Sequence, residues 1–257
     1  MGVLNVTPDS FSDGGASEGA AAPRALAMIE AGADIIDIGG ESTRPGAEPV
    51  DASEEIARVV PVIAALRAST NALISVDTMK PQVALAAISA GASIWNDVAA
   101  LQSPGALETA ASLQRPVILM HMQGEPRTMQ ANPHYHDVVA EVIAFLRARV
   151  IAVRAKGIAD LWVDPGIGFG KTLAHNLALL NAVQRIADET GVPVLIGASR
   201  KRFIAAIDER AKDAGKDRLG GSIAAALIAA QNGAAIVRVH DVAETVQAVK
   251  VWRALGN

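Results

Sequence analysis

The sequence predicts an α/β protein with the (β/α)8 TIM-barrel fold. Eight short apolar runs, each of which predicts a strand, end in a polar or glycine-rich cluster, and alanine-rich stretches of helical pattern separate them. The length of 257 residues is usual for one such barrel, so we expect a single domain over residues 1–257. An apolar content of 51% fits parallel strands that are buried on both faces.

The expected strands and helices alternate along the whole chain. The strands, in order, are Gly2–Val6, Ala33–Ile38, Ala72–Val76, Ala92–Trp95, Pro116–Met120, Asp160–Val163, Val192–Gly197 and Ala235–Val239. The helices are Ala21–Ala31, Ser53–Ala68, Pro81–Ala90, Pro104–Leu113, Tyr135–Lys156, Leu173–Thr190, Gly220–Gln231 and Val242–Leu255. Gly32 suits a helix end, while Ser53 and Pro81 suit helix starts. A doubly wound open sheet is the rival architecture, but no dinucleotide-binding fingerprint follows the first strand.

Composition and charge exclude several functional classes. A net charge of −4 argues against a nucleic-acid partner. No apolar window reaches the length of about 18 residues that a membrane span needs, and no signal-peptide pattern is present, so we expect a cytoplasmic protein. The absence of cysteine excludes disulfides, thiol catalysis and cysteine-ligated metals. Because aromatic residues make up 3% of the chain, we expect a core of Ala, Val, Ile and Leu.

Three polar side chains directly follow predicted strands and therefore converge on one rim of the barrel. They are Asp77, Asn96 and Asp164. An ionised Asp accepts hydrogen bonds and an Asn both donates and accepts, which suits a heteroaromatic ring with adjacent N–H and amino donors. Capping of the following helices, by Thr78 or by Asp97, is the alternative, and it explains Asp97 better than it explains Asp77.

Cationic residues form the counterpart of this acidic set. Arg238 and His240 alternate with valines and so point to one side of the last strand. Arg44 lies in a loop bounded by Pro and Gly, and Arg side chains suit phosphate or pyrophosphate. Ser199 to Lys201 follow the seventh strand, where barrels often bind phosphate, although a solvated basic turn would give the same pattern. His121 ends the fifth strand, and a lone histidine is more often structural.

The loop from Asp164 to Thr172 is rich in glycine but is not a phosphate-binding loop. Pro165 stands where the first glycine of that motif would be required, and Lys171 breaks the dinucleotide-binding spacing. A buried carboxylate at a strand end remains, followed by a backbone that can approach a flat ligand closely. We find no zinc-binding spacing and no serine nucleophile elbow.

Taken together, these strings resemble the dihydropteroate synthase family over essentially the whole chain. The segments that carry the resemblance are Leu4–Gly15, Asp37–Gly46, Asp164–Lys171, Ser199–Lys201 and Arg238–Asp241. The resemblance implies transfer of a dihydropterin-methyl group from its diphosphate to 4-aminobenzoate, in a homodimer that is a target of sulfonamide drugs. It also implies a short strand or hairpin before the first strand, which here starts at Gly2.

The resemblance also implies roles for individual residues. The pterin would contact Asp77, Asn96, Met120, Asp164 and Lys201; the diphosphate would contact Asn5, Thr43, Arg44, Arg238 and His240; and the aminobenzoate would contact Thr43, Pro45, Phe169 and Ser199. Asn5 would help bind Mg²⁺, whose other ligands would be diphosphate oxygens and water. Asp77, Asp164, Lys201 and Arg238 are the expected catalytic residues.

Two other functions remain open from the sequence. A corrinoid-linked methyltetrahydrofolate methyltransferase would share the Asp and Asn set, but methyl transfer has no need of the Glu41–Gly46 and Ser199–Lys201 segments, which would serve the diphosphate and the aminobenzoate. A catalytically silent pterin-binding paralogue would keep the fold without the reaction. Diphosphate release from the pterin substrate discriminates both from a synthase.

Overall fold

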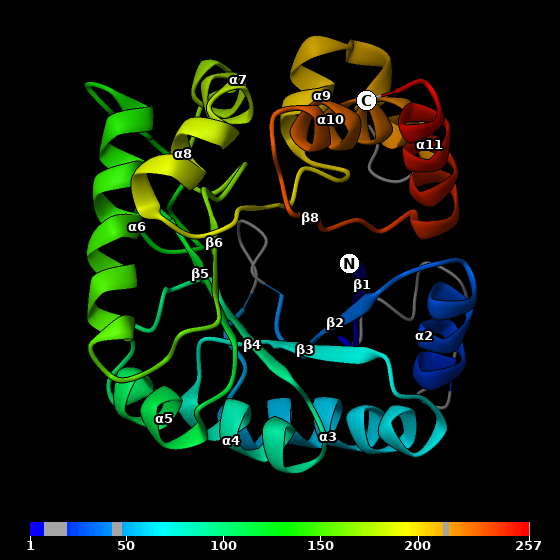
Figure 1. Cartoon of the computed structure of the whole chain (residues 1–257), viewed down its shortest axis with the longest axis vertical. Coiled ribbons are helices and arrows are strands. Elements are labelled where there is room, and N and C mark those ends of the chain that lie inside the picture. The colour runs from blue at the N-terminus through cyan, green and yellow to red at the C-terminus, as the bar shows by residue number, and fades with distance from the viewer. Residues whose placement is uncertain (8–19, 43–47, 213–215, 257) are drawn as a thin grey trace.

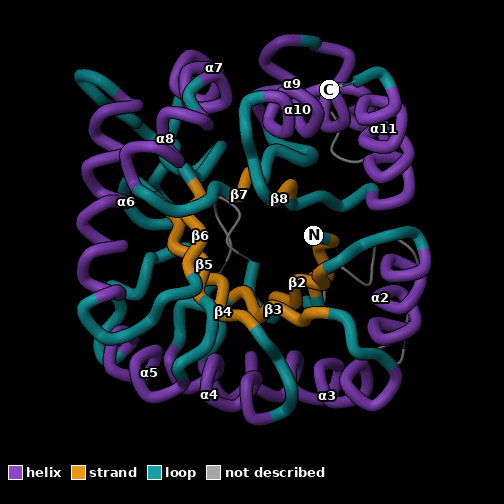
Figure 2. Tube along the Cα trace, viewed as in Figure 1, coloured by secondary structure: helices purple, strands orange, loops and turns teal. Residues whose placement is uncertain are grey.

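The strands of the computed structural model form an inner ring with helices outside it, as the sequence predicts (Figure 1; Figure 2). The structure describes residues 1–7, 20–42, 48–212 and 216–256. The strands are β1 (Gly2–Asn5), β2 (Ile35–Gly39), β3 (Leu73–Asp77), β4 (Ile94–Asp97), β5 (Val117–Met120), β6 (Leu161–Asp164), β7 (Leu195–Ile196) and β8 (Ile236–Val237).

The ring is closed, but its last two strands are short. β1 to β6 pair in chain order as one parallel sheet, and β7 pairs with β8. A bridge between Val163 and Val194 joins the β6 and β7 segments, and a bridge between Gly2 and Val239 joins the β8 and β1 segments. The backbone N–H of Val3 donates to the carbonyl of Val239 over 2.9 Å, which secures the second seam. The predicted barrel is therefore confirmed.

The helices lie in the predicted segments, with two differences. They are α2 (Ala21–Glu30), α3 (Ala52–Ser69), α4 (Pro81–Ser89), α5 (Ala106–Leu113), α6 (Val138–Arg154), α7 (Leu173–Asn181), α8 (Val183–Thr190), α9 (Arg202–Ile207), α10 (Leu219–Gln231) and α11 (Val242–Ala254), with 3-10 turns η2 (Glu209–Ala211) and η3 (Lys216–Arg218). The helix predicted over residues 173–190 is divided at Ala182, and the sequence does not predict α9. Among the helices of the described ranges, none combines the length and apolar content that a membrane crossing needs.

Helix ends follow local chemistry, with one correction. Gly32 has φ of +102° directly after α2, and Pro81 opens α4, as expected. The prediction that Ser53 starts the second helix was wrong, because Asp51 caps it by accepting the N–H of Glu54 over 2.9 Å. Asp51 takes the capping position instead of Ser53 because its side chain reaches the N–H of the third helical residue.

The core has two parts, built mostly from aliphatic residues as predicted. The larger part packs helices against strands, and alanines such as Ala84 and Ala229 are fully buried there. The smaller part fills the barrel interior and contains Met1, Ile35, Ile94, Ile118 and Leu195, with Trp162 and Ile236 against it. Because this apolar layer fills one level of the barrel, ligand space is confined to the level where the strands end.

Candidate active site

The strand register brings the predicted polar residues to one rim. Asn5 pairs with Gly39, Gly39 with Asp77, and Asp77 with Asn96, so β1 to β4 present these positions at a common level. Met120 pairs with Asp164 across β5 and β6 in the same way. Alternate strand residues face the same side, so these side chains share the interior with the positions two residues below them. The predicted convergence of Asp77, Asn96 and Asp164 is thus present in the fold.

An ion-pair network ties this rim together around Arg238. Its Nε donates to Asp37 Oδ2 over 2.6 Å, and its Nη2 donates to Asp77 Oδ2 over 2.7 Å. Asn96 Nδ2 also donates to Asp37 Oδ2, over 3.1 Å. The side chain of Asp37 is 0% exposed, while those of Asp77 and Arg238 are 13% and 20% exposed. The guanidinium of Arg238 therefore links the end of β8 to β2 and β3. Asp37 supports the rim residues from the level below them.

Asp37 is the residue that sequence reasoning missed. It lies inside β2, and the prediction of an apolar strand there gives it no role of its own. The signal was available, because a carboxylate inside a buried run is rarely left without a partner. Its partner is 201 positions away in the sequence, however, and no local pattern identifies such a contact.

Burial shifts the acid–base behaviour of the rim. It raises the pKa of Asp77 to about 7, although Arg238 opposes the shift; Asp37 adds to it. Burial also raises the pKa of Asp164, against the opposing effects of its hydrogen bond from Gly166 N–H and of the nearby cations. Asp77 can therefore hold or release a proton near neutral pH, and both carboxyl groups can accept hydrogen bonds from a ring N–H.

Two glycines lie among the polar side chains of the rim. A Cβ on Gly39 would lie 3.5 Å from Asp77 Cβ and 3.7 Å from Asn5 Oδ1. A Cβ on Gly197 would lie 3.8 Å from Asp164 Oδ2 and from Arg238 Cδ. A side chain at either position would therefore lie in van der Waals contact with the polar groups of the rim.

The loop after β6 contributes an aromatic wall. The Lys201 Nζ lies 3.9 Å from the centroid of the Phe169 ring, a cation–π arrangement. A Cβ on Gly168 would lie 3.1 Å from Lys201 Cδ, so the loop backbone also supports the lysine stem. The charge of Lys201 lowers the pKa of Asp164, against the larger effect of burial, which connects this wall to the acidic rim.

The segments after β7 and β8 are joined to each other. His240 Nδ1 lies 3.1 Å from Ser199 Oγ, and the His240 N–H donates to the same oxygen over 3.2 Å. Arg200 forms two hydrogen bonds to Asp241, of 3.1 and 2.5 Å, so it is a structural ion pair and not a solvated turn residue. Ser199 is buried. These bonds bring the predicted diphosphate and aminobenzoate residues of β7 and β8 side by side.

The contacts of His121 and Asp97 decide between the interpretations that the sequence left open for them. His121 is buried with its Nδ1 3.0 Å from Lys171 Nζ, so it is structural, and burial lowers its pKa to about 3. Asp97 accepts the N–H groups of Ala99 and Leu101 over 2.7 and 2.8 Å. It therefore stabilises the turn after β4 and lies outside the rim network. The expectation that it caps the following helix was wrong, because α5 begins only at Ala106.

Part of the predicted site lies outside the described residues. Thr43, Arg44 and Pro45 are in the range 43–47, which the structure does not describe. The predicted metal ligand Asn5 does lie at the rim. The described residues contain no group of three or more His, Cys, Asp or Glu placed to hold a metal ion. An ion held mainly by substrate phosphates needs few protein oxygens, so Asn5 fits Mg²⁺ that arrives with a diphosphate.

Comparison with known proteins decides the family. A protein-family model described as "Pterin binding enzyme" matches residues 1–240. The chain belongs to this family. A dihydropteroate synthase of Haemophilus influenzae is 50% identical over 262 residues, covering 100% of this chain and 94% of that protein.

Solved structures agree with the pterin-binding family. A Yersinia pestis dihydropteroate synthase in complex with a sulfonamide drug superposes with a TM-score of 0.94 at 47% identity, covering 100% of this chain and 93% of that one. A Xanthomonas albilineans dihydropteroate synthase with 4-aminobenzoic acid superposes with a TM-score of 0.93 at 52% identity, covering 100% and 92%. The fold class and the family resemblance predicted from the sequence are both confirmed.

Proposed function

We propose that this chain is a dihydropteroate synthase. It joins (7,8-dihydropterin-6-yl)methyl diphosphate to 4-aminobenzoate, giving 7,8-dihydropteroate and diphosphate in folate biosynthesis. The observation that carries the proposal is 50% identity, over the whole chain, to a relative of that name. The rim network of Asp37, Asp77 and Asn96 around Arg238 supports it, because the network supplies the acceptors that a pterin ring requires.

The pterin would occupy the acidic rim. Asp77, Asn96 and Asp164 would accept and donate hydrogen bonds at the edge of the ring, while Met120 packs near its face. Lys201 would lie between the pterin and the second substrate, because its ammonium group lies over Phe169 and acts on Asp164. The near-neutral pKa of Asp77 would let it share a proton with the bound ring.

The diphosphate would lie across the seam between β8 and β1. Arg238, His240 and Asn5 border that seam, and Thr43 and Arg44 would join them from the loop after β2. An arginine carries more N–H donors than the two that Asp37 and Asp77 use, so Arg238 can bind an anion without losing its carboxylates. The aminobenzoate would lie against Phe169 and Ser199, with Thr43 and Pro45 completing its pocket.

In the reaction, the bond between the pterin methylene carbon and the diphosphate oxygen breaks, and the electron pair leaves with diphosphate. Arg238 and His240 stabilise the charge that develops on the leaving oxygen. Asp77 and Asp164 stabilise the cationic methylene carbon, to which the arylamine nitrogen then bonds before losing its proton to solvent. Mg²⁺, held by Asn5 and the diphosphate, would supply Lewis-acid neutralisation of the leaving group.

A direct assay tests this function. The purified chain is incubated with the pterin diphosphate and 4-aminobenzoate, with Mg²⁺ or with EDTA, and diphosphate release is followed. We expect release that depends on both substrates and is lost with EDTA. Arg238→Gln should abolish release, whereas Arg210→Gln, which changes a side chain 91% exposed, should not. Folded protein that releases no diphosphate would refute the synthase and favour a silent paralogue.

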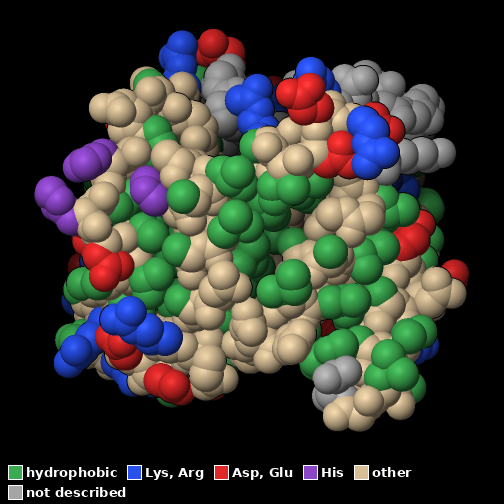
Figure 3. Space-filling model, turned by 90° about the horizontal axis from the view of Figure 1, so that it is seen from above, with side chains coloured by type: hydrophobic (Ala, Val, Ile, Leu, Met, Phe, Trp, Pro, Cys, Tyr) green, Lys and Arg blue, Asp and Glu red, His purple; other side chains and the backbone are tan. Residues whose placement is uncertain are grey.

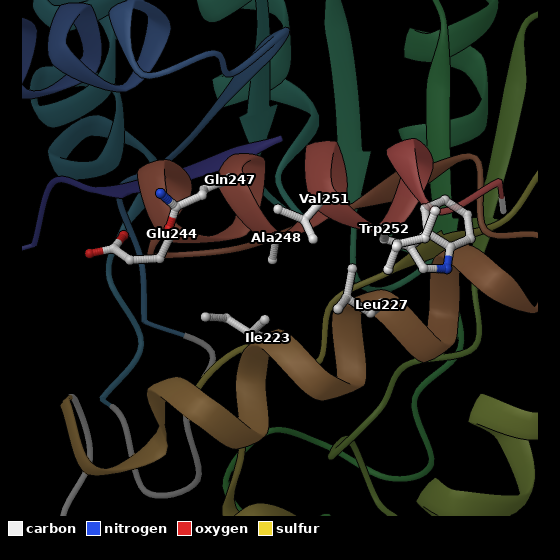
Figure 4. Close-up of a pocket in the computed structure, with 8 residues that line it drawn as sticks. Ile223, Leu227, Glu244, Gln247, Ala248, Val251 and Trp252 are labelled. Carbon is white, nitrogen blue, oxygen red and sulfur yellow. The ribbon is translucent and has the colours of Figure 1, made fainter.

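The assembly that we propose is a homodimer through α10 and α11. Ile223, Leu227, Ala248, Val251 and Trp252 line an apolar groove of about 530 Å³ between these helices (Figure 4). Val251 and Leu255 are 58% and 76% exposed. Apolar side chains gather across the middle of the face that carries these helices (Figure 3). A second copy is the occupant that we propose, because exposed apolar side chains gathered on one pair of helices suit the two-fold interface of a homodimer.

Single-domain organisation and location complete the proposal. The whole of residues 1–257 would act as one domain, because the ion pair from Arg238 to Asp37 joins the two ends of the chain within one ring. The proposed substrate is a charged diphosphate ester that does not cross a membrane unaided, so we place the reaction in the cytoplasm.

A further inference from the structure

The backbone of residues 168–170 is held by three side-chain donors, one on each successive carbonyl. The pairs are Gln130 Nε2 to Gly168 O (2.5 Å), Lys171 Nζ to Phe169 O (2.9 Å) and Tyr135 OH to Gly170 O (2.9 Å). We call these three donors the carbonyl clamp. Two of them come from the loop after β5, so one loop of the barrel fixes the backbone of the next.

The clamped backbone packs closely against the segment after β5. Gly168 and Gly170 have φ of +80° and +62°, and a Cβ on Gly170 would lie 2.4 Å from the carbonyl oxygen of Gln123. Such a close approach is possible for glycine alone at this position. The loop therefore rests directly on the segment after β5, with its carbonyls directed into the clamp.

Lys171 is the most deeply buried member of the clamp. It is 3% exposed, and besides Phe169 O it contacts His121 Nδ1 over 3.0 Å. His121 is fixed in turn by an edge-on contact with Phe145, with centroids 4.9 Å apart. Burial lowers the pKa of Lys171 to about 7 and that of His121 to about 3, so the imidazole is neutral and accepts from the lysine.

The residue between the two clamped glycines is the one that meets Lys201. The Phe169 ring lies 3.9 Å from Lys201 Nζ, and the Gly168 backbone supports the stem of the same lysine. Lys201 therefore lies on a surface whose position depends on the clamp. A shift of the clamped carbonyls would move the ring, and with it the ammonium group that acts on Asp164.

We propose that Gln130, Tyr135 and Lys171 are positioning residues that set the place of the Lys201 ammonium through the Phe169 ring. None of the three touches substrate in this scheme. Their role in turnover rests on the proposed synthase function, since Lys201 is the residue through which they would act. The clamp itself does not rest on that function, because its effect on Lys201 is measurable without substrate.

Tyr135→Phe is the variant that tests the clamp with least disturbance, since it removes one hydroxyl and keeps the ring. It is made in the native background and in a Phe169→Leu background, and Lys171→Met is made alongside. Two quantities are measured: kcat/KM for both substrates, and the rate at which an amine-directed reagent labels Lys201, followed by mass spectrometry. Thr190→Val is the control, because it removes a buried hydroxyl that donates to the Ile186 carbonyl over 2.6 Å on α8.

We expect Tyr135→Phe to lower kcat/KM about three- to tenfold and to speed Lys201 labelling, with both effects below about twofold when Phe169 is already Leu. Thr190→Val should leave both quantities unchanged. Equal effects of Tyr135→Phe in the two backgrounds would show a general structural role and overturn the inference. So would unchanged Lys201 labelling in both Tyr135→Phe and Lys171→Met. An inactive native enzyme would refute the synthase function, and the labelling result would still decide the clamp.

Discussion

Replacing Asp37 by Asn tests whether the rim depends on the buried carboxylate beneath it. Asp37 Oδ2 accepts from Arg238 Nε over 2.6 Å and from Asn96 Nδ2 over 3.1 Å. In the described part of the chain, Oδ1 has no hydrogen-bond partner. The substituted asparagine can keep one oxygen toward both donors, but it loses the charge and places an amide nitrogen where no acceptor is described.

The expected cost follows from those contacts. A hydrogen bond to a charged group contributes about 1.5–3 kcal/mol and a neutral one about 0.5–1.5, so loss of the charge costs ~1 kcal/mol. A buried amide without an acceptor adds about 1–3 kcal/mol. Arg238 remains paired with Asp77 and is 20% exposed, which favours the lower end. We expect the free energy of unfolding to fall by about 2–3 kcal/mol and kcat/KM to fall about tenfold or more.

The assay combines urea unfolding with steady-state measurement of diphosphate release. Asp97→Asn is the matched control, since Asp97 is also 0% exposed, lies next to Asn96 and accepts two backbone N–H groups. It should destabilise the protein by a similar amount and leave kcat/KM within about twofold. If Asp37→Asn lowered stability alone, or if both variants lowered kcat/KM equally, the argument that Asp37 positions Arg238 and Asn96 would be wrong.

Three further predictions concern the proposed binding, titration and assembly. Asp164→Asn should weaken pterin binding by about 1–3 kcal/mol, measured by calorimetry, because a buried acceptor is lost; unchanged affinity would remove Asp164 from the site. The pKa of Lys171 is lowered from 10.5 to about 7, so the unfolded chain binds more protons above pH 7. The stability of the native protein should therefore rise from pH 7 toward pH 10 relative to Lys171→Met, and parallel urea-unfolding profiles would contradict this. Val251→Glu should dissociate the dimer in sedimentation experiments, while Ile151→Glu, at a position 61% exposed on α6, should not; a dimer that survives Val251→Glu would place the interface elsewhere.

Much of the fold could be predicted because the barrel repeats a local pattern. Each strand is a short apolar run with a polar end, and register then places Asp77 and Asn96 together without further information. The local pattern does not predict features that depend on tertiary contacts, such as the length of each strand. The expected strand over residues 192–197 is shorter in the structure, Leu195–Ile196, although Pro193 and Val194 still accept backbone N–H groups of Val163 and Ala235.

The sequence predicts the residues that line the candidate site, but not the buried residues that hold them in place. Asp164 and Arg238 lie at the ends of strands, which is where barrels of this fold bind their ligands. Asp37 and Lys171 were not assigned roles, because what distinguishes them is burial against partners far away in the sequence. In the sequence, Lys171 only interrupts the dinucleotide-binding spacing. Its contact with His121, 50 positions away, shows that it is a buried residue held by a distant partner.

The uneven closure of the barrel has a consequence for its motions. The strands β7 and β8 have two residues each and meet the rest of the ring through isolated bridges, which hydrogen bonds among Met1, Val3, Val237 and Val239 supplement at the seam between β8 and β1. Ser199 and Arg238 follow these strands, so the part of the ring with the shortest strands carries part of the candidate site. Amide protons there should exchange with solvent sooner than those of β1 to β6. A bound substrate that contacts both Asn5 and Arg238 would connect the β1 and β8 segments across their seam and slow that exchange.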